Sequence, residues 1–469
     1  MKKTLILSFF MLLFSGMMYS QFREFNLSDF KLPDIKRQRL DMNLNLTMNN
    51  RFDNNHVESL SHDKFNVWRL ANTDNFFYGS YKNTAKLQSE QSYSLNFEPL
   101  WSRQKTESYK NTNFQLNTDI SISSINRKYF SGKLFFEPDF QFSASYENDK
   151  VTSTTQTDKT ITDYASVEIP LLIGKGRIEQ VQDARLAIYI LEDLNKQGRL
   201  SHTPDNSEIL EFASFIAILK NERYFDYRLK RIEEIEKIDS FMQVKNWISK
   251  PDAAYFTTVY DNWEYADGPI RNSGKRISGG VIPEFSFSRY YLLHDFELDP
   301  DDESDSRTTG GGISAIVKYN SAKPVSLYWQ RDWDADLSYS FGRTWDNEKI
   351  TDSKYNYNQH WINSNIDYSL GYYPNSRTNF NVDLGLEGTL MFSKYSDYHV
   401  EKASGYIISP FLSLRANYYV SPQLRLSAYY NTGYSYSNID RTFIPYSKLY
   451  SKVNSLYQNM NISFTYSFF

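Results

Sequence analysis

The sequence of 469 residues contains no cysteine. This absence excludes disulfide scaffolds, Cys-ligated zinc or iron–sulfur sites, thiol catalysis and a lipid anchor on an N-terminal cysteine. An excess of either charge is also missing: 52 basic and 56 acidic residues give a formal charge of −4, so there is no electrostatic case for a nucleic-acid partner. Long apolar runs are excluded by the mean hydropathy of −0.59, whereas a polytopic helical membrane protein needs several runs of about 20 apolar residues.

Aromatic residues are abundant by contrast, with 37 Tyr, 33 Phe and 8 Trp. Disordered chains are poor in aromatic and β-branched residues, so disorder is excluded as well. The chain is long enough for one large domain or for two to three ordinary ones. The question that the composition poses is where so many tyrosines would lie.

The first twenty residues predict a secretory signal peptide, residues 1–20. Lys2 and Lys3 form a positive segment, and a 10-residue apolar stretch follows over residues 5–14. That stretch is too short to span a bilayer. We expect cleavage after Ser20 and a mature chain that starts near Gln21; the alternatives are an uncleaved anchor or a buried helix.

Beyond the signal, apolar and polar residues alternate with a period of two in many segments. Side chains on a β-strand point to opposite faces in turn, so each such segment would have one apolar and one polar face. The clearest apolar sets are Leu40 to Met48, Phe380 to Phe392, Leu412 to Val420, Leu424 to Tyr436 and Met460 to Phe468, each taken at every second residue.

A soluble β-sandwich gives the same alternation, but three features favour a transmembrane barrel. The predicted strands are often longer than a dozen residues, whereas strands of soluble domains mostly have about five or six. Short turns such as 374–376 and 421–423 alternate with long loops such as 294–307, 343–354 and 437–454. Aromatic residues gather near strand ends, as in the interfacial girdles of barrels in lipid.

The signal followed by Gln21, together with the terminal strand that ends in Phe464, Tyr466, Phe468 and Phe469, resembles outer-membrane β-barrel proteins of Gram-negative bacteria, most closely those of the Bacteroidota type. The resemblance implies localisation in the outer membrane, both chain ends in the periplasm, and a last strand that the insertion machinery recognises. In that family the last residue is in phase with the apolar face. Here Phe468 is in phase and Phe469 is not.

We therefore predict an all-β transmembrane protein, an antiparallel up-and-down outer-membrane barrel of about 14 strands (12–16). Residues 21–39 form a periplasmic N-terminal segment, 40–174 the first half of the barrel with about six strands, and 275–469 the second half with about eight. The predicted strands cover 40–50, 74–86, 90–104, 112–126, 130–147, 157–173, 276–296, 308–321, 324–342, 355–373, 377–395, 402–420, 422–437 and 456–469.

Between the two halves, residues 175–274, the period changes to that of helices, which predicts a small three-helix insert and a linker. Gly198 can end the first helix, Asp205 with Glu208 resembles a capping box at the start of the second, and Leu229 to Met242 marks the third. An even number of strands before the insert places it in the periplasm, if both chain ends are periplasmic. The stretch from Gly176 to Arg185 resembles a segment of uncharacterised barrels of this type.

The polar face of the predicted strands is rich in carboxylates and should line the lumen. The functional interpretation is a cation-favouring pore, or a site for a cationic or polyhydroxylated solute. The alternative is a hydrated interior in which acids pair with bases of neighbouring strands; a register error would move a whole set to the other face. The candidate pore-lining residues are Glu98, Asp119, Glu137, Asp139, Asp332, Asp334, Asp336, Asp367, Asp383 and Glu387.

Two further patterns are weaker. Asp299, Asp301, Glu303 and Asp305 alternate as in calcium loops, but the mid-loop glycine and the distal glutamate are missing, which favours a solvated acidic loop. We expect no metal and no cofactor. Some barrels are hydrolases with a histidine at the outer rim, for which His360 and His399 are the candidates, although no serine or acid spacing singles either out.

The sequence thus predicts a channel or transporter for small hydrophilic or cationic solutes and no enzyme. One alternative is an assembly or scaffold component that recruits a periplasmic partner through the helical insert, and a second is a hydrolase with its site at the rim. The expected partners are the lipid bilayer, the insertion machinery of the outer membrane and a periplasmic protein.

Overall fold

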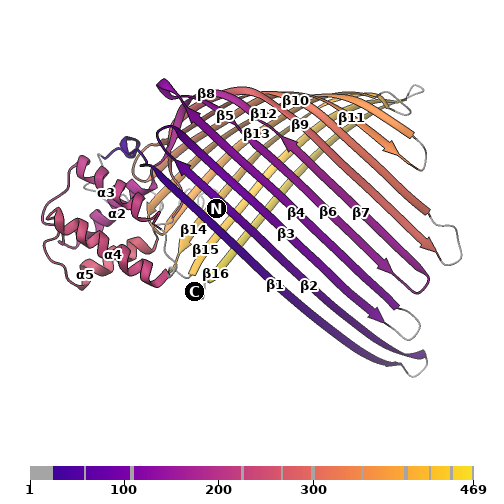
Figure 1. Ribbon diagram of the computed structural model, residues 1–469, viewed down its shortest axis with the longest axis horizontal. Coiled ribbons are helices and arrows are strands. Elements are labelled where there is room, and N and C mark those ends of the chain that lie inside the picture. Colours follow the sequence, from indigo (N-terminus) through magenta and orange to yellow (C-terminus); the bar gives the residue numbers. More distant parts are fainter. Residues whose placement is uncertain are drawn as a thin grey trace, which may run out of the picture.

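A computed structural model describes residues 25–57, 60–105, 110–222, 227–265, 268–296, 302–349, 353–395, 400–421, 424–443 and 447–466. The strands form one large antiparallel sheet, and a group of helices lies against one end of it (Figure 1). We call this end of the strands proximal and the other end distal. In the part of the chain that the structure describes, no helix is long and apolar enough to cross a membrane.

Sixteen strand segments make up the sheet. They are β1 (Ile35–Val57), β2 (Leu60–Asn83), β3 (Leu87–Lys105), β4 (Lys110–Tyr129), β5 (Leu134–Pro138), β6 (Phe140–Thr152), β7 (Gln156–Glu168), β8 (Leu171–Gln180), β9 (Asn272–Phe296), β10 (Asp302–Pro324), β11 (Trp329–Glu348), β12 (Ser353–Asn375), β13 (Thr378–Tyr395), β14 (Val400–Tyr419), β15 (Leu424–Phe443) and β16 (Ser447–Tyr466). Apart from β5 to β8, each strand pairs with its neighbours in chain order, and β1 and β16 are the two ends of the order.

Two of the long strands are broken in the middle. β5 and β6 are separated by Asp139 alone and both pair with β4, while β7 and β8 both pair with β9. Proline cannot donate a hydrogen bond to the ladder, and Pro138 and Pro170 stand at the two breaks. The ladder is rejoined across the breaks, because the Asp139 N–H donates to the Pro170 carbonyl at 2.8 Å and the Ile169 N–H to the Pro283 carbonyl at 3.0 Å.

Every predicted strand overlaps one strand or one broken strand of the sheet, but the predicted long loops are wrong. Residues 343–348 and 353–358 are paired in β11 and β12, and β15 and β16 continue through most of 437–454. In these segments polar residues occur on both faces, as Arg343 and Asp346 do on β11, so the alternation of hydrophobicity is interrupted. Their backbones pair nevertheless.

The two faces of the sheet differ sharply in character. One face, which we call the apolar face, exposes large hydrophobic side chains on strand after strand, including Leu44 (67%), Phe285 (55%), Leu337 (56%) and Leu384 (49%). The opposite, polar face carries the alternating residues. A sandwich would bury the apolar face against a second sheet, whereas here it covers the outside of a single sheet.

Four helices connect β8 to β9, rather than the three that were predicted: α2 (Gln182–Lys196), α3 (Asn206–Leu219), α4 (Tyr227–Val244) and α5 (Ala253–Glu264). The capping box at Asp205 and Glu208 is confirmed, since the Asp205 side chain accepts from the Ser207 and Glu208 N–H groups and Glu208 accepts from the Asp205 N–H. Gly198, with φ of +65°, follows the end of α2 as expected.

The fourth helix was missed although its buried residues Tyr255, Val259 and Trp263 are spaced four apart, because the exposed Phe256 and Tyr260 reduce the contrast between its two faces. The insert also begins later than predicted. Residues 175–180 still pair with β9, and the close approach of these two strands requires glycine: a Cβ at Gly176 would lie 2.0 Å from the Lys275 carbonyl oxygen.

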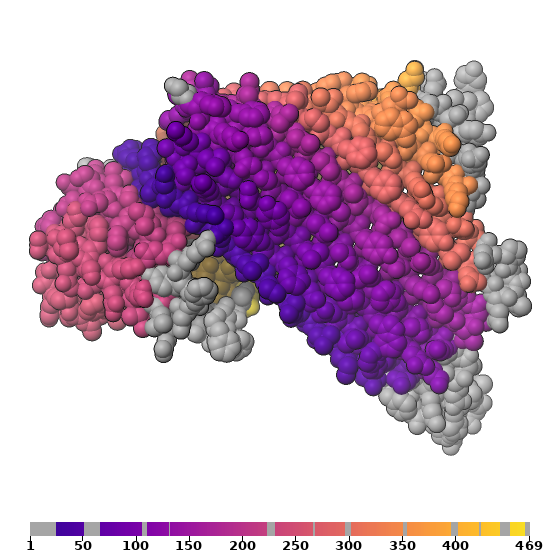
Figure 2. Space-filling view, viewed as in Figure 1, coloured from indigo at the N-terminus to yellow at the C-terminus, as the bar shows by residue number. Residues whose placement is uncertain are grey.

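The buried apolar core lies in the helices and not on the sheet. It joins residues of α2 to α5 with the segment from Phe25 to Ile35 and with Leu327 in the β10–β11 turn. Figure 2 shows the helices as a separate lobe against the proximal end of the sheet. We call α2 to α5 the helical domain.

Candidate functional site

Six of the ten predicted carboxylates form one continuous acidic field on the polar face of β11, β12 and β13. Strand register places Asp334 directly opposite Asp367. On one side of this pair, Asp336 and Glu387 flank Asn365; on the other, Asp332 and Asp383 flank Ser369. The prediction that Asp332, Asp334 and Asp336 share a face of one strand agrees with this register.

Neutral side chains donate to most of these carboxylates. The Asn320 amide donates to Asp334 at 2.6 Å, and the Gln330 amide to Asp332 at 2.6 Å. Asn365 donates to Asp367 at 2.7 Å, and Ser369 to Asp383 at 2.6 Å. Amides and hydroxyls orient these carboxylates without bringing a positive charge to them.

Bases border the acidic field on the β10 side. Lys318 is the register partner of Asp336, and Arg276 of β9 donates to Asn320 at 3.2 Å. Arg127 of β4 pairs with the buried Glu137. Sequence reasoning missed Arg127 and Arg276 as polar-face bases, because they lie at or just beyond the ends of the predicted strands.

The other four predicted carboxylates lie elsewhere on the polar face. Glu98 and Asp119 are opposite Asn117 and Asn96 on β3 and β4. Glu137 and Asp139 are buried beside the strand break, where Asp139 accepts from the Asn126 N–H at 2.9 Å. The ten predicted residues thus separate into a field on β11–β13 and scattered acids on β3–β6.

The acidic segment before β10 does not form a calcium site in the described residues. Asp299 and Asp301 lie outside them, and Glu303 faces Lys349 at 3.8 Å. Asp305 is buried and accepts from Arg289 and Arg307, each at 2.9 Å. No group of three potential metal ligands occurs in the part of the chain that is described.

Of the two predicted rim histidines, the structure describes His360. His360 lies on the apolar face, where its Nδ1 is 2.8 Å from the Tyr339 hydroxyl, and His399 lies outside the described residues. The structure instead joins His294 of β9 to Asp158 of β7 at 2.7 Å, a cross-strand pair that the sequence analysis did not single out. Residues 136 positions apart give no local signal.

The predicted insertion signal is described only in part. Phe464 is 75% exposed on the apolar face of β16, and Tyr466 is the last residue of that strand. Phe468 and Phe469 lie outside the described residues, as does the whole predicted signal peptide.

Arg271, in the segment between α5 and β9, binds the β10–β11 turn, whose Leu327 belongs to the core of the helical domain. It is fully buried and donates to the carbonyls of Leu327, Ser326 and Trp329, the last two at 2.9 and 2.8 Å. Burial, followed by the nearby Arg185, lowers the pKa of Arg271 to about 10, so the guanidinium remains charged at neutral pH. Arg271 also donates to Gln330 at 3.3 Å, and Gln330 donates to Asp332, which connects this anchor with the acidic field.

A second contact involves the tyrosine pair at the end of β12. Tyr372 lies on the apolar face against Trp329, whereas Tyr373 is buried on the polar face. The Tyr189 hydroxyl of α2 donates to the Tyr373 carbonyl at 2.7 Å, and the guanidinium of Arg185 lies 5.6 Å from both rings. Alternate residues of a strand point to opposite faces, so only Tyr372 of this pair lies on the apolar face, where the aromatic girdle was expected.

The segment Gly176 to Arg185 forms the joint between sheet and helices. Arg177 donates to the carbonyls of Thr84 and Ala85, in the β2–β3 turn. The fully buried Asp183 pairs with Arg37 of β1 at 3.7 Å and with Lys220 at 3.2 Å. The charged residues of the segment Gly176 to Arg185 therefore have a structural role.

The helical domain touches strands from distant parts of the sheet order. In addition to Arg37 of β1 and Tyr373 of β12, Arg377 in the β12–β13 turn pairs with Asp261 of α5, and Tyr265 packs against Tyr419 at the end of β14, with ring centroids 5.6 Å apart. Strands so far apart in the order can meet one domain only if the sheet curves around its proximal end, as Figure 1 shows.

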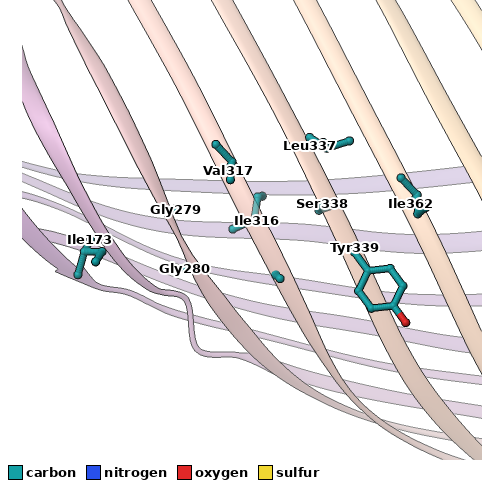
Figure 3. A pocket seen from close by; sticks show the side chains of 10 residues that line it. Ile173, Gly279, Gly280, Ile316, Val317, Leu337, Ser338, Tyr339 and Ile362 are labelled. Carbon is teal, nitrogen blue, oxygen red and sulfur yellow. The ribbon is translucent and has the colours of Figure 1, made fainter.

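A hollow of about 760 Å³ lies on the apolar face, not at the acidic field (Figure 3). It forms where Gly279 and Ala315 leave space between Val317, Leu337 and Ile362. Its lining offers no acid or base for chemistry.

No family model matches the chain, and no curated protein matches it. Among solved structures, a chain titled "CymD monoaromatic hydrocarbon channel" is similar at 11% identity over 93% of this chain and 89% of that chain, with a TM-score of 0.11. A likeness at this TM-score supports neither a shared fold nor a shared function.

Proposed function

We propose that the protein is an integral outer-membrane β-barrel whose polar face lines a cation-favouring pore, with the helical domain across its periplasmic mouth. The observation that carries this proposal is the acidic field of β11–β13, where Asp334 and Asp367 are direct neighbours without a base between them. A ring or patch of carboxylates favours cations in a pore.

The exposed apolar face supports the membrane placement. Large hydrophobic residues are exposed on every long strand from β9 to β14. Exposure of such residues to water costs free energy, whereas their exposure to lipid does not. Counting β5 with β6 and β7 with β8 as single crossings reduces the sixteen segments to 14 membrane strands.

Closure of the sheet is part of the same proposal. β1 and β16 end the strand order, and apolar residues of both are highly exposed, with Leu46 at 69% and Phe464 at 75%. Unpaired backbone groups are costly in a hydrocarbon environment, where only closed barrels and helices satisfy them. We infer that β1 pairs with β16 in the membrane.

The contacts of the helical domain support a role as a cap. It holds β1, the β10–β11 turn, β12 and β14 at once, so it spans the proximal mouth of the proposed barrel. A pore capped in this way should conduct little until the domain moves or is removed.

Ion selectivity in planar bilayers tests the pore. The barrel in which a short Gly-Ser linker replaces residues 182–264 should conduct with a preference for cations, and the full chain should conduct less. Adding Asp332→Asn, Asp334→Asn and Asp336→Asn to the linker variant should reduce the preference several-fold. The matched control removes three charges at the distal end of the same barrel, with Glu303→Gln, Asp346→Asn and Glu348→Gln. Equal selectivity of the two triple variants would overturn the assignment of the acidic field as pore lining.

A specific observation also favours the second candidate, a scaffold that recruits a periplasmic partner. The helical domain exposes Ile232 (51%), Phe256 (39%) and Tyr260 (47%). Changing these three residues to Ser in the full chain should then abolish co-purification of one defined periplasmic protein while the cap stays docked. If no protein depends on them, this alternative fails and the pore proposal is unaffected.

A further inference from the structure

A pocket of about 350 Å³ lies between the distal ends of β2 and β3, far from the helical domain. It is lined by Asn66, Trp68, Trp101, Arg103 and Lys105. The two indole rings meet edge to face, with centroids 4.7 Å apart and planes at 75°. The pocket therefore combines an aromatic wall with two cations.

The strand phase places this pocket on the apolar face. Leu95 and Phe97 are exposed there, each 37%, and Trp101 and Arg103 follow in the same phase. Trp101 is the register partner of Phe114, another exposed residue of that face. Two residues along a strand advance by about 6.6 Å, so the apolar face continues to Trp101, and Arg103 and then Lys105 lie directly beyond it.

Among the described residues, no acid is a register partner of the two cations of the pocket. Arg103 has Trp68 and Thr112 as its register partners, and Lys105 is directly opposite Lys110. Like charges directly opposite each other destabilise a sheet. An anion bound between them would offset this repulsion, so the register itself favours an anionic ligand.

The order of residues matches the layers of a lipid molecule. Tryptophan rings lie at the level of lipid headgroups and can pack against the C–H face of a sugar ring. Arginine binds phosphate oxygens with two parallel N–H groups, and lysine binds them as a point charge. Below them, the apolar face offers a surface for acyl chains.

We propose that this pocket binds the phosphorylated sugar headgroup of a glycolipid in the leaflet at the distal end of the barrel. Arg103 and Lys105 hold the phosphate, Trp68 and Trp101 pack against the sugar, and the acyl chains follow the apolar face past Phe97. The inference rests on the proposed membrane placement, since only then does this face meet lipid.

Native mass spectrometry of the detergent-solubilised full chain tests the proposal with a diphosphorylated, acylated glucosamine disaccharide as the probe. The unchanged chain should retain it. The double variant Arg103→Gln, Lys105→Gln should bind it at least about tenfold more weakly, because the charge-assisted hydrogen bonds to phosphate are lost. The control, Lys196→Gln with Lys250→Gln, removes two charges from the helical domain and should bind like the unchanged chain.

Two further arms separate the parts of the ligand. The same glycolipid without phosphates should bind weakly and equally to the unchanged chain and the double variant. Trp101→Leu should weaken the binding of the glycolipid more than the binding of phosphatidylglycerol, which carries phosphate but no sugar. Glucosamine phosphate without acyl chains serves as a competitor. If it binds with the same affinity as the glycolipid, the ligand is a soluble one and the lipid assignment is overturned.

Equal retention by the double variant and the unchanged chain would overturn the proposal outright. Heat-modifiable electrophoretic migration of each variant shows whether the barrel is folded. If the chain inserts and conducts as proposed but does not bind the glycolipid, this inference alone is contradicted. If the chain never enters a bilayer, the membrane placement itself is contradicted.

Discussion

Asp334 and Asp367 lie directly opposite each other on β11 and β12, with both side chains on the polar face. One carboxylate oxygen of Asp367 is buried and accepts no hydrogen bond. The protein maintains a like-charge pair at the centre of its acidic field, which is unfavourable for the sheet and so points to a functional requirement for the charge.

Asp367→Asn should stabilise the folded protein. The substitution removes the repulsion and supplies an amide that can donate to Asp334, a gain of about 0.2–1 kcal/mol for a cross-strand pair. Asp336→Asn is the matched comparison, because Asp336 faces Lys318 and its substitution removes an attraction. Thermal unfolding in detergent should show shifts of opposite sign; shifts of the same sign would contradict the register argument.

Arg271→Met should loosen the β10–β11 turn where it meets the helical domain. Each buried carbonyl left without a donor costs about 1–3 kcal/mol. The Leu327 and Ser326 carbonyls lose their donor, whereas the Trp329 carbonyl still accepts from the Val325 and Ser326 N–H groups. Hydrogen exchange should rise in the turn 324–329 while the exchange of α3 stays unchanged. Arg199→Met is the control, since Arg199 pairs with Asp252 inside the domain at 2.9 Å and its loss should raise exchange in α5 instead. Unchanged exchange in the turn would show that Arg271 is not the anchor.

The start of α5 should be sensitive to acid. The hydrogen bond from Arg199 holds the pKa of Asp252 at about 2, below the usual range of an aspartate, while the carboxylate also accepts the Tyr255 N–H. A lowered folded-state pKa gives stability that is present above about pH 4 and is lost as the pH falls towards 2. The difference in unfolding temperature between the unchanged chain and Asp252→Asn should therefore be constant from pH 5 to 8 and shrink below pH 4. A constant difference down to pH 2 would contradict this account.

Closure of the barrel can be tested directly because the chain has no cysteine. We expect one pairing of Leu44→Cys in β1 with a single cysteine at Leu456, Gln458, Met460 or Ile462 in β16 to form a disulfide in native membranes. Bridging requires Cα atoms closer than about 7 Å, which only paired strands provide. Leu44→Cys with Leu384→Cys, on the distant strand β13, is the negative control. If no β16 position cross-links in the correctly inserted protein, β1 and β16 are not paired and the edges are covered by something else.

The sequence by itself determined the strands and the capping of the helices. Alternation along Leu40 to Met48 and along Phe380 to Phe392 marks two faces wherever one face is apolar, and Asp205 with Glu208 determines a helix start within four residues. These signals are local, because side chains alternate along a strand and caps bind adjacent N–H groups. They fail where polar residues interrupt the alternation, as in 343–348, and where both faces of a helix carry large apolar residues, as in α5.

Only the tertiary structure decided which residues meet. Strand register places Asp334 opposite Asp367 and separates both from Glu98 and Asp119, and a shift of one residue would have reversed every face. The docking of Arg271 on the β10–β11 turn likewise joins groups that are 55 to 58 positions apart. Such contacts depend on the curvature and pairing of the whole sheet, which no local pattern of residues encodes.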